Sequence, residues 1–241
     1  MLNEGKKGSG MPEMLSAQSK DKALKSTRKG MLIIVSGPSG TGKGTLCERL
    51  VSSDDNIIFS VSATTRQRRE CEKNGVHYHF ISETQFDELL KTNNLLEHAT
   101  VHDHRYGTPR RPIEDALNKG LDVLLDVDSQ GAMSVMKQMK DCVSIFILPP
   151  SFASLKLRLH TRNTDDEQEI EKRLNNARTE IAKFVNYDYA LINDELESAY
   201  ERLKCIIAAE RQKTVRYTPV IPEELTEEEI LWQSTSPASN P

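Results

Sequence analysis

The segment Gly-Pro-Ser-Gly-Thr-Gly-Lys-Gly-Thr at residues 37–45 constrains the fold of this chain more than any other feature. It directly follows the apolar run 31–35 and precedes a helix-compatible stretch at 46–51. A buried strand, a glycine-rich turn and a helix in this order form a phosphate-binding loop, because backbone N–H groups converge on phosphate oxygens where no Cβ intervenes. The helix N-terminus adds its partial positive charge, and the lysine reaches the outer phosphates. The segment predicts a nucleoside triphosphate site made by Gly37, Pro38, Ser39, Gly40, Thr41, Gly42, Lys43, Gly44 and Thr45.

Two kinds of pattern alternate between residue 31 and about residue 213. Short β-branched runs predict strands at 32–36, 57–63, 123–127, 144–148 and 189–192. Amphipathic stretches predict helices at 44–52, 84–92, 110–118, 130–139, 151–160, 167–184 and 195–213. Such alternation is typical of an α/β fold, in which a central parallel sheet lies between helices and binds ligands at the carboxyl ends of its strands.

Three segments depart from this alternation. Residues 64–108 are turn-rich and polar, with short strands expected at 78–81 and 95–101, and are interpreted as an inserted subdomain. Residues 1–30 are rich in Gly, Ser and Lys, so we expect a disordered N-terminal extension. Residues 214–241 combine prolines with an acidic run and are interpreted as a C-terminal tail. The expected folded domain is therefore 31–213.

The net charge and the spacing of the cysteines limit the classes of partner and the cellular location that we expect for this chain. A formal net charge of −4 does not favour nucleic acid as the main partner. No apolar run reaches the length of a membrane span, and no secretory signal is recognisable. The four cysteines are scattered without the spacing of a disulfide framework or a zinc site. We therefore expect reduced thiols, a cytoplasmic protein and small-molecule partners, with no nucleic acid and no membrane.

A second candidate anion site lies in the insertion. Arg66, Arg68 and Arg69 stand close together, with Glu72 and Tyr78 following. The planar guanidinium group of arginine matches the geometry of phosphate oxygens. A charge-dense loop is more often simply solvated. In a chain that already has a triphosphate loop, however, an arginine cluster is interpreted as the site of a phosphate-bearing acceptor.

Longer motifs extend this pattern over the whole expected domain. They are Ser-Val-Ser-x-Thr-Thr-Arg at 60–66, Arg69, Glu72, Gly75, Tyr78, Leu-Glu-His at 96–98, Tyr-Gly-Thr at 106–108, Leu-Asp-Val-Asp-x-Gln-Gly at 125–131, Phe-Ile-Leu-Pro-Pro at 146–150 and Asn193-Asp194. In this order and spacing the chain resembles the guanylate kinases, which phosphorylate GMP to GDP with ATP. The resemblance implies a three-layer P-loop kinase fold with a central parallel sheet, an inserted GMP-binding subdomain and a helical lid. It also implies ATP and GMP, with dGMP, as substrates.

The resemblance assigns the acceptor site residue by residue. The GMP-binding residues that it implies are Ser62, Arg66, Arg69, Glu72, Tyr78, Glu97, Tyr106, Gly107, Thr108 and Asp126. Guanine presents its N1–H and 2-amino donors side by side, so one carboxylate accepts from both, whereas adenine offers neither. A buried Glu97 would discriminate between the two bases by on the order of 10⁴. An ordinary surface carboxylate is the alternative interpretation of Glu97, and Asp128 is expected to orient the arginines of the acceptor loop.

A helical lid is expected at about 158–173. Arg158 and Arg162 stand four residues apart, on one face if the helix persists, and Thr164 with Glu167 forms a capping box for a second helix. Two solvated helices with i,i+4 ion pairs are the alternative. In the family, the matching arginines close over ATP. We hypothesise that the catalytic residues, which surround the transferred phosphoryl group, are Lys43, Arg69, Arg162 and Arg173, and that the ATP site also includes Arg158, Asn193 and Asp194.

Gly44 departs from the usual loop, because a Ser or Thr hydroxyl normally contacts Mg²⁺ at this position. Thr45 stands one residue too late for the same contact. We expect Mg²⁺ to accompany ATP and to be held mainly by ATP oxygens and water, with no direct protein ligand.

Two other functions stay open on the residues alone. One is a non-catalytic guanylate-kinase-like module that binds partner proteins, and the other is a related kinase with a different acceptor. Such modules typically lack the glycine loop and the lid arginines, both of which are present here. Ser62, Glu97, Tyr106 and Thr108 favour guanine as the base of the acceptor.

Overall fold

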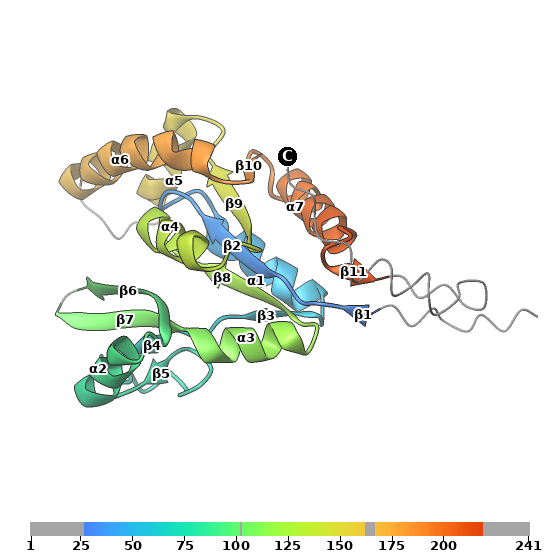
Figure 1. The fold of residues 1–241 in the computed structure, drawn as a ribbon. Helices are drawn as coiled ribbons and strands as arrows, with labels where there is room; N and C mark the ends of the chain where they lie inside the picture. Colours follow the sequence, from blue (N-terminus) through green and yellow to red (C-terminus); the bar gives the residue numbers. More distant parts are fainter. Residues whose placement is uncertain (1–26, 102, 162–166, 219–241) are drawn as a thin grey trace, which may run out of the picture. The chain divides into compact units, whose positions relative to one another are not determined.

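The computed structural model describes residues 27–101, 103–161 and 167–218. Within these residues, a five-stranded parallel sheet has the strand order β10-β9-β2-β8-β3 (Figure 1). Its strands are β2 (Leu32–Ser36), β3 (Ile57–Phe59), β8 (Asp122–Asp126), β9 (Val143–Leu148) and β10 (Tyr189–Ile192). The central position of β2 places the glycine-rich segment that follows it at the middle of the sheet's carboxyl edge.

Helices cover both faces of this sheet. One layer contains α1 (Lys43–Ser53) and α7 (Leu196–Arg211), and the other contains α3 (Arg110–Asn118) and α4 (Ser129–Gln138). Along β2, Ile33 and Val35 belong to the apolar cluster on the α1/α7 side, and Leu32 and Ile34 belong to the cluster on the α3/α4 side. Burial on both faces explains why β2 is a continuous apolar run. The expected α/β fold with three layers is confirmed.

The insertion forms a sheet of its own with the order β5-β4-β7-β6. Its elements are β4 (Ala63–Thr64), β5 (His79–Phe80), α2 (Glu83–Lys91), β6 (Leu95–Val101) and β7 (His104–Pro109). The helix α2 begins with a capping box, in which Ser82 Oγ accepts from the backbone of Gln85 and the Gln85 side chain accepts from the backbone of Ser82.

The lid region contains α5 (Phe152–Thr161), α6 (Glu167–Ile181) and the 3₁₀ helix η1 (Ala182–Asn186). The helices α5 and α6 pack on each other through a separate apolar cluster of Leu155, Leu159, Ile170, Leu174 and Ala177. Figure 1 shows this pair and the insertion on opposite sides of the central strands. The expected residues Arg162 and Thr164 lie outside the described residues.

The two ends of the described chain pair with each other. The antiparallel strands β1 (Thr27–Arg28) and β11 (Tyr217–Thr218) extend ordered structure past both expected bounds of the domain, 31 and 213. Beside them, Arg28 and Arg211 both bind the carboxylate of Asp122, which is fully buried. Residues 1–26 and 219–241, expected as extension and tail, lie outside the described residues.

Most of the expected strands and helices are confirmed within one or two residues, and one strand was predicted wrongly. The strand expected at 57–63 ends at Phe59. After Ser60 the chain leaves the core sheet, and Ala63 pairs with Gly107 in the insertion instead. The strand β7 was not predicted, because its sequence His-Arg-Tyr-Gly-Thr-Pro shows no alternation of apolar and polar residues. Among the described helices, none is long and apolar enough to cross a membrane.

Candidate active site

The glycine loop connects β2 to α1 with a backbone that side chains would not permit. Gly37 has φ 142°, and a Cβ on it would stand 2.3 Å from the carbonyl oxygen of Ile147 in β9. Gly42 has φ 85°, and a Cβ on it would stand 2.4 Å from Nδ2 of Asn193. Gly42 is also the N-cap of α1 and provides no side-chain hydrogen bond to the first turn. The N–H groups of that turn are therefore available to an anion.

Lys43 spans this loop. Its Nζ donates to the carbonyl oxygen of Gly37 at 3.0 Å and lies 3.8 Å from Oδ1 of Asp126. Asp126 ends β8, where it pairs in register with Val35 of β2. Burial raises the pKa of the Asp126 carboxyl, and the charge of Lys43 opposes this rise. A lysine and a carboxylate thus meet at the carboxyl edge of the two central strands.

The ATP-side residues expected outside the loop are held against it. Nδ2 of Asn193 donates to the carbonyl oxygen of Thr41 at 2.7 Å. The Arg158 guanidinium donates to the carbonyl oxygens of Asn193 at 2.9 Å, Asp194 at 3.3 Å and Thr41 at 3.4 Å. A cavity of about 440 Å³ opens beside them, lined by Gly40, Gly42, Thr45, Leu157, Arg158, Thr161, Asn193 and Leu196. Within the loop, Thr41 is buried and its Oγ1 donates to the carbonyl of Pro38, whereas Ser39, Gly44 and Thr45 are exposed.

The expected acceptor-phosphate residues form a second cluster in the insertion. The Arg66 guanidinium donates to both carboxylate oxygens of Glu72, at 2.6 and 3.1 Å. Glu72 also accepts from the backbone N–H of Arg69 at 2.8 Å. Arg66 lies 5.7 Å from the ring centre of Tyr78, whose ring meets that of Tyr106 edge-on at 5.8 Å. The hydrogen bonds from Arg66 lower the pKa of Glu72 to about 2.

The expected base-reading residues lie on the neighbouring strands. Oγ1 of Thr108 donates to Oε1 of Glu97 at 2.5 Å. Burial raises the pKa of Glu97, and the bond from Thr108 opposes this rise. A Cβ on the buried Gly107 would stand 3.0 Å from the backbone carbonyl oxygen of Glu97, so the two strands pass close together here. Ser62 joins this sheet through its carbonyl, which accepts from the N–H of His79 at 2.8 Å.

The described contacts join Arg69 to the acceptor cluster through its backbone N–H, and Arg173 and Asp128 lie on other elements. Arg69 is exposed, and Arg173 lies on α6 with its Nε 4.0 Å from Oε1 of Glu169. Asp128, expected to orient the acceptor arginines, instead caps α4, since its Oδ1 accepts from the backbone N–H groups of Gln130 at 3.0 Å and Gly131 at 2.8 Å. An aspartate two residues before the helix predicted at 130–139 is a capping signal that the sequence carried.

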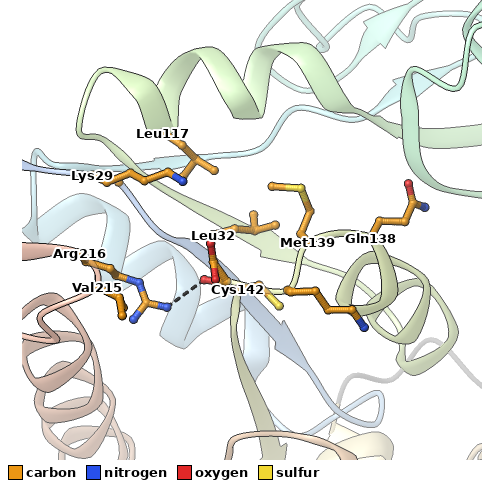
Figure 2. A pocket seen from close by; sticks show the side chains of 11 residues that line it. Lys29, Leu32, Leu117, Gln138, Met139, Cys142, Val215 and Arg216 are labelled. Carbon is orange, nitrogen blue, oxygen red and sulfur yellow. Dashed lines mark hydrogen bonds between the residues drawn. The ribbon is translucent and has the colours of Figure 1, made fainter. Parts of the chain in front are cut away.

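A second cavity lies at the amino ends of the central strands, away from the glycine loop (Figure 2). It measures about 240 Å³ and is lined by residues that include Leu32, Leu117, Met139, Cys142 and Arg216. The guanidinium of Arg216 is already paired, because it donates to the carbonyl oxygen of Asp141 and to the carboxylate of Glu210. The arginine that lines this cavity is therefore already engaged within the fold.

Comparisons with known proteins agree with this geometry. The family model described as guanylate kinase matches residues 29–210. The guanylate kinase of Agrobacterium fabrum is 47% identical over 190 residues, covering 78% of this chain and 86% of that protein. The guanylate kinase of Clostridioides difficile is 44% identical over 201 residues, covering 83% of this chain and 98% of that protein.

A solved structure extends the likeness to three dimensions. The crystal structure of guanylate kinase from Anaplasma phagocytophilum is 35% identical, with a TM-score of 0.62, and the match covers 80% of this chain and 92% of that one. The matched residues include both clusters described above, the glycine loop with Lys43 and the insertion with Arg66 and Glu97. From its sequence and its fold, this chain belongs to the guanylate kinase family.

Proposed function

We propose that this chain transfers the γ-phosphoryl group of ATP to GMP, giving ADP and GDP, and that it also accepts dGMP. The observation that carries the proposal is the combination of two sites in one fold. The glycine loop with Lys43 suits a nucleoside triphosphate, and the insertion pairs an arginine–tyrosine cluster with a partly buried carboxylate, Glu97. A kinase needs one site for the donor and one for the acceptor.

The donor site uses backbone groups more than side chains. The uncapped N-terminus of α1 offers N–H groups to the β- and γ-phosphates, and Lys43 exchanges its bond to the Gly37 carbonyl for a phosphate oxygen. Asn193 and Arg158 hold the Thr41 carbonyl and so fix the far side of the loop. We assign the cavity beside them to the nucleoside part of ATP.

The acceptor site separates phosphate from base. Arg66, Arg69, Tyr78 and Tyr106 hold the GMP phosphate, and Glu72 keeps Arg66 in place through its two hydrogen bonds. Ser62, Glu97 and Thr108 read the guanine edge. The Thr108 hydroxyl occupies one lone pair of Oε1, which leaves the other lone pairs of the Glu97 carboxylate for the two guanine donors.

The lid supplies positive charge during transfer. Phosphoryl transfer requires alignment of donor and acceptor and neutralisation of the charge on the moving group, with little covalent work by the protein. We assign this role to Lys43, Arg69, Arg162 and Arg173. Because Arg173 lies on α6, its charge arrives with the lid, which also excludes water from the reacting phosphates.

Mg²⁺ fits this site as a partner of ATP. A Cβ on Gly44 would meet no atom within 4 Å, so packing does not exclude a hydroxyl there, and the chain nevertheless lacks one. Among the described residues, no group of three or more His, Cys, Asp or Glu side chains could hold a metal ion by itself. We therefore assign Mg²⁺ mainly to ATP oxygens and water, with Asp126 as the carboxylate that faces its water shell. Bound Mg²⁺ neutralises phosphate charge.

One coupled assay tests the proposal. ADP formation is measured with ATP and each of GMP, dGMP, AMP, CMP and UMP, with Lys43→Ala as the inactive control. We expect turnover with GMP and dGMP only. Turnover with another nucleotide would identify a related kinase, and no turnover with any acceptor would identify a non-catalytic module.

The scattered cysteines lead us to propose a cytoplasmic location, which fractionation of the source cells would test.

A further inference from the structure

A β-bulge lies at the base-reading strand. Strand β6 pairs with β7 in the register Leu95 with Pro109 and His98 with Gly107. Between these two pairs, Leu96 and Glu97 of β6 face the single residue Thr108 of β7. A bulge of this kind bends its strand and redirects its side chains, and bulges are common beside active sites. Here the redirected residue is Glu97, whose Oε1 reaches Thr108 Oγ1 at 2.5 Å.

Gln138, the last residue of α4, holds this bulge from outside the sheet. Its Nε2 donates to the carbonyl oxygen of Leu96 at 2.7 Å, and its Oε1 accepts from the guanidinium of Arg110. A carbonyl only accepts and a guanidinium only donates, so the two partners fix the orientation of the amide. The peptide bond is planar, so the Leu96 carbonyl lies in one plane with the nitrogen and Cα of Glu97. Fixing that carbonyl therefore fixes where the Cα of Glu97 lies, which is the point from which the Glu97 side chain leaves the strand.

The first turn of α4 reaches Glu97 as well. A Cβ on Gly131 would stand 3.4 Å from Oε2 of Glu97, so this oxygen lies against the helix. Glu97 and Gln138 also line the same cavity of about 250 Å³, together with Ser134 of α4. The helix that Asp128 caps thus contacts the bulge through the backbone of Leu96 and through the carboxylate of Glu97.

We propose that Gln138 is a positioning residue for the choice of acceptor base: its amide, held by Arg110, sets the Leu96–Glu97 peptide plane so that Glu97 meets both donors of guanine. The proposal rests on the proposed function, because it requires Glu97 to read guanine. Gln138 itself touches no substrate in this account and acts through Glu97.

The test compares Gln138→Leu with the neighbouring control Lys137→Leu, which changes an exposed residue of the same helix. Steady-state kinetics are measured with GMP and with inosine monophosphate, which lacks the 2-amino group. We expect Gln138→Leu to raise the KM for GMP by about five- to tenfold, the effect of one lost hydrogen bond. The KM for ATP and the Tm should match those of Lys137→Leu, and the preference for GMP over inosine monophosphate should fall. Equal increases in the KM values for GMP and ATP would show a merely structural role and overturn the proposal.

A double-mutant cycle with Glu97→Gln then identifies the route of the effect. If Gln138 acts through Glu97, adding Gln138→Leu to Glu97→Gln changes GMP binding much less than adding it to the wild type. Additive effects would contradict the proposal. If the unmodified chain did not phosphorylate GMP at all, the proposed function would fail; if it did and Gln138→Leu left the KM for GMP unchanged, only the role of Gln138 would fail.

Discussion

Replacement of Asp122 by alanine tests how the two ends of the described part of the chain are fixed to the core. The Asp122 side chain is fully buried and accepts from the backbone N–H of Met31 at 2.9 Å, from Nε of Arg211 at 2.8 Å and from Arg28. The Arg28 and Arg211 side chains are only 18% and 20% exposed. Removing the carboxylate therefore leaves the Met31 N–H without this acceptor and takes the buried anion away from two largely buried cations, of which Arg211 keeps Asp54 and Arg28 keeps the carbonyl oxygen of Gly120.

The expected loss in the free energy of unfolding follows from the buried ion pairs that are broken. Breaking a buried ion pair by removing one partner typically costs about 3–5 kcal/mol. In a domain of this size each kcal/mol shifts the midpoint of thermal unfolding by about 2–4 °C, so Asp122→Ala should lower the Tm by about 6–20 °C. Asp122→Asn retains an acceptor for the Met31 N–H, so its Tm should lie between that of the wild type and that of Asp122→Ala.

Differential scanning calorimetry measures this effect, with Asp54→Ala as the matched control. Asp54 also binds Arg211, at 2.6 Å, but its side chain is 23% exposed, so its removal should cost about 1 kcal/mol. The comparison that decides is between the losses of stability caused by Asp122→Ala and by Asp54→Ala. If Asp122→Ala were no more destabilising than Asp54→Ala, the buried carboxylate would not be what anchors β1 and α7, and the reasoning would be refuted.

Three further predictions concern the candidate site. Arg66 lowers the pKa of Glu72 from 4.5 to about 2, so the stability from this pair is complete above pH 4.5 and is lost as the pH falls toward 2. The free energies of unfolding in urea of the wild type and of Glu72→Gln should therefore differ by a constant amount from pH 7 to 5 and converge below pH 4.5. A difference that varied between pH 5 and 8 would contradict this prediction. Arg173→Ala should lower kcat by about 10³-fold with little change in the KM for GMP, whereas Arg178→Ala on the same helix should change neither. Equal losses in both parameters would exclude a role for Arg173 in the transfer step. Gly44→Ser should leave the Mg²⁺ dependence of turnover unchanged. A large gain in apparent Mg²⁺ affinity would contradict the assignment of Mg²⁺ mainly to ATP oxygens and water.

Local features of the site could be predicted from the sequence because they depend on neighbouring residues. The loop at 37–45 follows from glycines at fixed positions between an apolar run and a helix, and its backbone angles at Gly37 and Gly42 are as that pattern requires. Arg66 and Glu72 were predicted as residues of the acceptor site, and their pairing across a short loop was found only in the structure. The motifs also predicted which residues belong to the acceptor site, whereas the contacts between these residues came only from the fold.

Features that depend on pairing between distant segments could not be predicted. The exit of the chain from the core sheet after Phe59 depends on where Ala63 finds a partner, and that partner is Gly107. The bulge at Leu96 depends on the register of two strands, which no periodicity in either strand reveals. The strands β1 and β11 have only two residues each, so pairing between chain ends stabilises them more than local propensity does.

The contacts of α5 explain how the donor loop and the lid influence each other. The apolar cluster shared by α5 and α6 is separate from the two clusters of the core sheet, so few apolar contacts tie the lid helices to the core. Ile181 of α6 packs against the core, and α5 contacts the loop: a Cβ on Gly40 would stand 3.0 Å from Leu159 and 3.1 Å from Leu155, and Arg158 donates to the Thr41 carbonyl. Any movement of α5 must therefore break these contacts or displace the backbone that surrounds the phosphates. Because we assign ATP to the same backbone, we expect occupation of the loop and the position of the lid to be coupled.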